Sequence, residues 1–147
     1  MNGNRSEVGE SDLMGETPCP YFFAYGTLRR GARKDLRNFA PGRARLLGPA
    51  TVPGRLYDLG DYPGMLDPAA VGDRVVGELY ELGEIDETLE RLDEYEGCEA
   101  GRGGFRRCIR SVLLEGGRAR NAWIYLYQGE VSERQRIATG DCFRRRE

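Results

Sequence analysis

A chain of 147 residues has the length of a single domain that buries its own hydrophobic core, so it needs no disulfide or structural metal to fold. Its 22 basic and 24 acidic residues nearly cancel, which argues against nucleic acid as the main partner, because nucleic-acid-binding proteins carry a basic face. The absence of histidine excludes Ser-His and Cys-His catalysis and most zinc sites, and the absence of a long apolar run argues against a membrane span.

The two ends of the chain differ in composition from its middle. Residues 1–17 are polar and lack apolar periodicity, so we expect a disordered N-terminal tail. They also lack the basic-then-apolar order of a secretory signal, so a cytoplasmic location is expected. A single domain is expected to span residues 18–143. Residues 144–147 are expected to form a solvated basic tail, with a weak site for an anionic partner as the alternative.

The first predicted strand is the aromatic run Tyr21-Phe22-Phe23-Ala24-Tyr25, which follows Pro20. The segment Gly26-Thr27-Leu28-Arg29-Arg30-Gly31 interrupts it. A loop with two glycines directly after a buried strand can turn its backbone N–H groups toward a ligand. This loop is therefore a candidate binding element.

Further strands are predicted before the helix at Arg45–Leu47, Thr51–Leu59 and Val75–Leu82, with a turn at Gly60–Gly64. After the helix, Phe105–Leu114 and Ala119–Tyr127 flank Glu115-Gly116-Gly117 and form a predicted hairpin. In the second arm of this hairpin, one face carries the aromatic residues Trp123, Tyr125 and Tyr127. Many short strands and few helices favour an α+β domain built on an antiparallel or mixed barrel.

One helix is predicted from Asp86 to Glu96, with Asp86 as its N-cap and Gly97 as the left-handed residue that ends it. At about 100° per residue, its apolar stripe consists of Ile85, Leu89 and Leu92. The solvent-facing side carries Asp86, Glu87, Glu90, Asp93 and Glu94. Glu96 is the exception among the acidic residues, because it falls in the middle of the apolar stripe.

An inward carboxylate on the last turn of a helix is costly to ionise. Burial and the negative end of the helix dipole both disfavour the charged form of Glu96, so both raise its expected pKa toward neutrality. Such a group suits proton transfer in both directions. Two structural alternatives stay open: the helix frays before Glu96 and leaves it in water, or Glu96 forms an ion pair with an arginine.

Two segments resemble the γ-glutamylcyclotransferase-like family. Tyr25-Gly26-Thr27-Leu28 resembles the family's Y-G-[ST]-L substrate loop, and Leu92-Asp93-Glu94-Tyr95-Glu96-Gly97 resembles its L-D-x-x-E-G segment, whose last acidic residue is the acid–base catalyst. Four more segments resemble family motifs in the family's order: Gly54-Arg55-Leu56-Tyr57, Gly77-Glu78-Leu79-Tyr80, Phe105-Arg106-Arg107 and Thr139-Gly140-Asp141. The resemblance covers about Tyr21 to Phe143 and is to bacterial members related to γ-glutamylamine cyclotransferases.

This resemblance implies a small mixed β-barrel with flanking short helices that uses no cofactor and no metal. It also implies an acyl transfer that releases 5-oxoproline when the α-amine of a small γ-glutamyl substrate attacks its own γ-carbonyl. The substrate supplies the nucleophile, which suits a chain without histidine. Glu96 is implied as the general acid and base, and the implied substrate-binding residues are Tyr25, Gly26, Thr27 and Leu28.

Several alternatives stay open at this stage. Tyr125 is a further candidate for substrate binding, with packing as its alternative, and Tyr25 has a core role as its alternative. Phe105 stands where the family usually has tyrosine, so the leaving amine is open. Two other functions remain: a non-catalytic small-molecule-binding module on the same fold, and a deprotection cyclotransferase in a biosynthetic pathway. The sequence does not determine the oligomeric state.

Overall fold

The computed structural model describes residues 19–26, 44–60, 62–96 and 104–143, without the side chains of Tyr95 and Glu96. The expected tails at residues 1–17 and 144–147 lie outside these ranges, as do Thr27, Leu28 and Gly97. The elements in chain order are β1 (Tyr21–Ala24), β2 (Ala44–Pro53), β3 (Arg55–Asp58), β4 (Pro63–Leu66), β5 (Arg74–Leu82), α1 (Ile85–Glu96), β6 (Phe105–Leu114), β7 (Ala119–Tyr127) and the 3-10 helix η3 (Glu133–Gln135).

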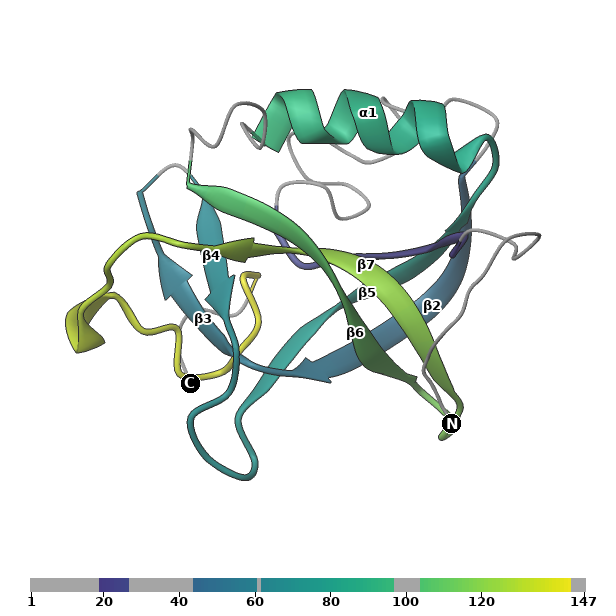
Figure 1. The fold of residues 1–147 in the computed structure, drawn as a ribbon. Coiled ribbons are helices and arrows are strands. Elements are labelled where there is room, and N and C mark those ends of the chain that lie inside the picture. Colours follow the sequence, from purple (N-terminus) through teal and green to yellow (C-terminus); the bar gives the residue numbers. More distant parts are fainter. Residues whose placement is uncertain (1–18, 27–43, 61, 97–103, 144–147) are drawn as a thin grey trace.

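Five of these strands close a barrel in the order β1-β5-β2-β6-β7 (Figure 1). Neighbouring strands run antiparallel except for β1 and β7, which are parallel, with Phe22 opposite Trp123. The expected α+β fold with a small mixed barrel is therefore confirmed. No helix in the described ranges is long and apolar enough to cross a membrane.

The alternation of side chains along each strand divides the core in two. Phe23 of β1 and Ile124 of β7 belong to the cluster inside the barrel, together with Val75 of β5. The chain neighbours of Phe23 and Ile124, among them Phe22 and Tyr125, belong to a second cluster between the barrel and α1. The predicted aromatic face of β7 is confirmed, because this second cluster holds Trp123, Tyr125 and Tyr127.

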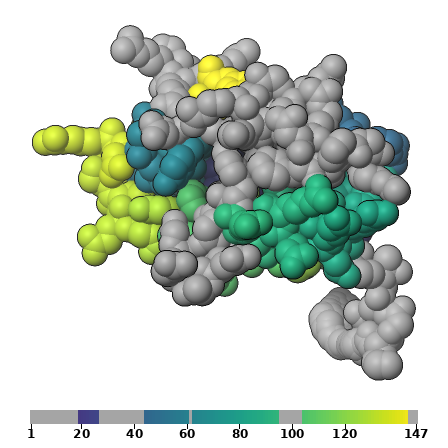
Figure 2. Space-filling model, turned by 90° about the horizontal axis from the view of Figure 1, so that it is seen from above, coloured from purple at the N-terminus to yellow at the C-terminus, as the bar shows by residue number. Residues whose placement is uncertain are grey.

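Helix α1 lies across one outer face of the barrel, where its outward side forms exposed surface (Figures 1 and 2). Leu89 and Leu92 are 5% and 0% exposed and pack in the second cluster, which confirms the predicted apolar stripe. Fully burying one leucine side chain contributes about 1.5–3 kcal/mol to stability. The helix begins one residue earlier than predicted, so Asp86 lies within its first turn rather than at its N-cap.

The second and third strands correct the sequence-based boundaries. Instead of ending at Leu47, β2 continues through a bulge between Leu46 and Gly48, whose φ of 139° suits glycine. The break between the two strands comes at Gly54, where a Cβ would meet the Met65 side chain and the Leu66 carbonyl oxygen. The expected turn at Gly60–Gly64 is shorter than predicted, since β4 already begins at Pro63 and pairs with β3.

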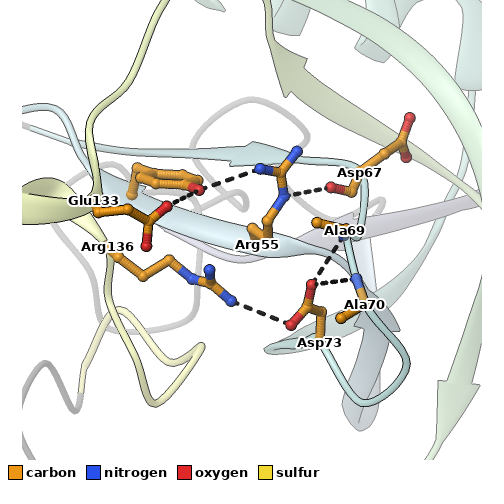
Figure 3. A network of polar contacts seen from close by, with 8 residues as sticks. Arg55, Asp67, Ala69, Ala70, Asp73, Glu133 and Arg136 are labelled. Carbon is orange, nitrogen blue, oxygen red and sulfur yellow. Dashed lines mark hydrogen bonds and ion pairs between the residues drawn. The ribbon is translucent and has the colours of Figure 1, made fainter.

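The segment after β7 contacts β3, β5 and the loop between β4 and β5, and Figure 3 shows the side-chain contacts of its Glu133 and Arg136. The amide of Ile137 donates to the Leu56 carbonyl at 2.8 Å, and the amide of Val76 donates to the Gly140 carbonyl at 2.7 Å. Arg136 pairs with Asp73 of the loop between β4 and β5. This segment therefore lies beside β3, away from α1 (Figure 1).

Candidate active site

The last turn of α1 is tied to the barrel through Asp93. The Arg107 guanidinium on β6 makes a bidentate contact with this carboxylate, donating from Nε to Oδ1 at 2.7 Å and from Nη2 to Oδ2 at 2.9 Å. The Tyr125 hydroxyl on β7 donates to the same Oδ1 at 2.6 Å. Asp93 and Arg107 are 21% and 25% exposed, so the pair is largely shielded from water. Bidentate, charge-assisted contacts of this kind fix the relative orientation of the two side chains as well as contributing interaction energy.

Arg107 is itself held from its other side. Its guanidinium carbon lies 4.5 Å from the centre of the Trp123 ring, in a cation–π contact. The Trp123 indole N–H donates to the Cys19 carbonyl at 3.0 Å. The arginine that binds Asp93 of α1 is therefore held in place by an aromatic ring on the neighbouring strand.

Tyr125 also joins this contact to the end of β1. Its backbone carbonyl accepts a hydrogen bond from the Tyr25 hydroxyl at 2.7 Å, and that hydroxyl accepts one from the Met65 amide at 3.2 Å. Tyr25 is buried in the barrel cluster. Its hydroxyl therefore joins β1 to β7 and β4.

Gly26 follows directly and is also buried. A Cβ at this position would lie 2.6 Å from Cγ of Pro63, at the start of β4. Only glycine allows the chain to pass this close to that proline. The backbone thus leaves β1 through a narrow passage beside the β3–β4 hairpin.

A second carboxylate on the α1-facing side was missed by the sequence analysis. Glu78 of β5 lies opposite Ala24 in the β1–β5 pairing and is partly buried. The Tyr80 hydroxyl donates to it at 3.2 Å. The available signal was the alternation of β5, which places Glu78 and Tyr80 on the same face.

Three aromatic rings gather where β6 begins and β7 ends. Phe105 pairs with Tyr127 across the two strands, with ring centres 5.4 Å apart. The Tyr62 ring lies 5.9 Å from that of Phe105 and is 42% exposed. Phe105 is therefore a buried ring in contact with an exposed tyrosine.

The sequence-predicted site residues are described to different extents. Tyr25, Gly26 and Tyr125 lie together at the junction of β1, β7 and α1. Thr27, Leu28 and the Glu96 side chain lie outside the described residues. The backbone of Glu96 ends α1, one turn beyond Asp93. The junction therefore combines the described parts of both sequence motifs.

Metal ligands were also sought in the described structure. No group of three or more Cys, Asp or Glu side chains there is arranged to hold a metal ion. The junction offers hydrogen bonds, ring faces and paired charges.

Solved structures of similar fold come from several kingdoms. An AIG2-like protein from Mus musculus is 27% identical with a TM-score of 0.62, over 78% of this chain and 80% of that one. The uncharacterised protein PH0828 from Pyrococcus horikoshii is 26% identical with a TM-score of 0.59, over 83% and 88%. YkqA from Bacillus subtilis shares the fold at 23% identity and a TM-score of 0.63, over 83% of this chain but only 39% of its own.

The sequence itself matches one family model over most of its length. A comparison with curated protein sequences found no match. The model for γ-glutamyl cyclotransferase, AIG2-like, matches residues 22–144, a range that contains every strand and helix after the start of β1. By this match over most of its length, the chain belongs to the AIG2-like γ-glutamyl cyclotransferase family.

Proposed function

We propose that this protein is a cyclotransferase that releases 5-oxoproline from a γ-glutamyl amine or a γ-glutamyl amino acid. The observation that supports this most is the chain of hydrogen bonds from Asp93 through Tyr125 to Tyr25. It joins the helix segment that resembles the family's catalytic motif to the strand end that resembles its substrate loop.

The proposed reaction needs no nucleophile from the protein. The α-amine nitrogen of the substrate attacks the γ-carbonyl carbon, and the new C–N bond closes a five-membered ring. The bond from that carbon to the leaving nitrogen then breaks. Because both reacting groups belong to one molecule, holding them in contact supplies much of the acceleration.

Glu96 is the proposed general acid and base. As a base it takes a proton from the attacking amine, and as an acid it gives one to the leaving nitrogen. The same proton can serve both steps, so the reaction consumes no water. Backbone N–H groups of Gly26, Thr27 and Leu28 are the proposed donors to the oxyanion that forms on the γ-carbonyl.

Direct detection of 5-oxoproline tests the proposal. The full chain is incubated with γ-glutamyl amines and γ-glutamyl amino acids, and 5-oxoproline is quantified by chromatography. Each substrate has a matched control whose α-amine is acetylated, which removes the nucleophile and should stop release completely. If no substrate with a free α-amine yields 5-oxoproline, the enzyme proposal fails. Binding without turnover would then favour a non-catalytic small-molecule-binding module.

A further inference from the structure

We propose that Asp93 and Arg107 form a positioning pair that holds the last turn of α1, and with it Glu96, in the place that acid–base catalysis requires. This inference rests on the proposed function. It extends that function to an ion pair between the helix and the barrel.

The contacts of the pair are directional hydrogen bonds as well as an attraction between charges. Both carboxylate oxygens of Asp93 are occupied by Arg107, and Tyr125 adds a third short contact. A second ion pair among the described side chains of α1, between Glu87 and Arg91, lies within the helix and is more than half exposed. Exposed pairs of that kind contribute little. Of these two pairs, Asp93–Arg107 is the one that joins the helix to the barrel.

The last turn of α1 needs an external partner. It carries no basic residue, and its acidic residues lie at the negative end of the helix dipole, which favours fraying. Arg107 brings a positive charge to this end from β6. The helix sequence alone therefore gives its last turn little stability, and the barrel supplies the missing positive charge through Arg107.

Two adjacent residues fix how this turn is rotated about the helix axis. Leu92 is 0% exposed and anchors the turn in the apolar cluster. Asp93, the next residue, anchors it through polar contacts about 100° further round. Glu96 comes three residues after Asp93, and residues at this spacing are neighbours on a helix. A turn fixed at both points has little freedom to redirect Glu96.

Two variants of the full chain test the pair, and a third provides a matched control. Asp93→Asn removes the charge and keeps the size of the side chain. Arg107→Lys keeps the charge but loses the bidentate contact with Asp93 and the stacking on Trp123. Asp67→Asn is the control. Asp67 forms the same kind of bidentate contact with Arg110 of β6, but this contact joins β6 to the loop after β4 and not to α1.

We expect Asp93→Asn and Arg107→Lys to lower kcat by roughly tenfold to a hundredfold, because small misplacements of reacting groups are this costly. KM should change little, and Asp67→Asn should leave both constants unchanged.

Hydrogen exchange gives a readout that does not depend on activity. Amides of the last turn of α1 should exchange faster in both variants and at the wild-type rate in Asp67→Asn. If Asp93→Asn and Arg107→Lys turn over as fast as the control, the inference is wrong while the proposed function stands. If the wild type releases no 5-oxoproline, the proposed function fails. Unchanged exchange in both variants would then also contradict the claim that the pair holds the turn.

Discussion

Asp93 lies about 80° from the centre of the apolar stripe, on the side of α1 that periodicity assigns to solvent. It is nevertheless only 21% exposed and binds Arg107 and Tyr125. The helix pattern could not reveal this, because Arg107 is 14 residues away in sequence and on another element. Glu94 behaves as the periodicity predicts and is exposed. A helical wheel describes the helix alone, and a partner on β6 changes the outcome for one of its residues.

At this scale, the sharpest prediction concerns Glu96. Glu96→Gln should lower the rate of 5-oxoproline release by roughly a hundredfold or more while substrate binding persists, since the amide keeps the shape and loses the base. Calorimetric binding and steady-state rates on the same preparation would measure both effects.

Glu94→Gln is the matched control, because Glu94 lies on the same turn and is exposed. It should retain wild-type turnover. Full activity in Glu96→Gln would move the catalytic role elsewhere. Glu78→Gln would be tested next, because Glu78 is the partly buried carboxylate on the α1-facing side of β5.

At the scale of elements, the sequence predicted well where a period was long and regular. The α1 stripe and the β6–β7 hairpin were found, because the helix has a clear apolar spacing and the hairpin turn has Gly116 and Gly117 at positive φ. Strand β4 was missed, because its first residues, Pro63 and Gly64, are turn formers by type. Their strand conformation comes from pairing with β3, which is a tertiary contact.

The segment after η3 gives a prediction about stability. Gly140 has a φ of 72°, and a Cβ there would collide with the Arg74 carbonyl oxygen of β5. Gly140→Ala should therefore destabilise the protein by about 1–3 kcal/mol or more, through backbone strain and the clash together. Urea unfolding followed by circular dichroism would measure the change.

Gly72→Ala separates the two causes. Gly72 has a φ of 97°, but a Cβ there meets nothing within 4 Å. That variant should lose only about 1–2 kcal/mol, the cost of a left-handed conformation for a residue with a Cβ. Equal losses in the two variants would mean that the Gly140 clash is relieved by a small backbone shift.

For the whole molecule, stability should depend on acid in a defined way. Hydrogen bonds from the amides of Ala69 and Ala70 lower the pKa of Asp73, and Arg136 adds to this. A hydrogen bond from Arg110 lowers the pKa of Asp67. A carboxyl whose pKa is lower in the folded protein stabilises it above the ordinary value of about 3.9, and this stabilisation is lost as the pH falls through the lowered pKa.

The melting temperature should accordingly fall as the pH drops below about 4. Asp73→Asn should melt lower than the wild type at neutral pH and should lose less on acidification, because it no longer has this carboxylate to protonate. Glu90→Gln, on the exposed side of α1, serves as the control and should follow the wild type. Parallel acid curves for Asp73→Asn and the wild type would contradict the role given to Asp73.

Metal removal gives another test on the whole protein. The chain has no histidine, and the proposed reaction needs only proton transfer and positioning. Dialysis against a strong chelator should therefore leave the rate of 5-oxoproline release unchanged. A loss of activity that added Mg²⁺ or Zn²⁺ restores would show that a metal takes part.

The parallel pairing of β1 with β7 has a consequence for the order of folding. Phe22 lies opposite Trp123 in this pairing, so β1 cannot complete its strand pairing until β7 is present. On a ribosome, β1 and β5 can pair while β7 is still being made, but the ring cannot close. Contacts between residues so distant in sequence carry a large loop-closure cost before they return any energy, and they slow folding. Closure of the barrel should therefore be a late event that follows synthesis of β7, and the hydrogen bond between Tyr25 and Tyr125 should be among the last contacts of the barrel to form.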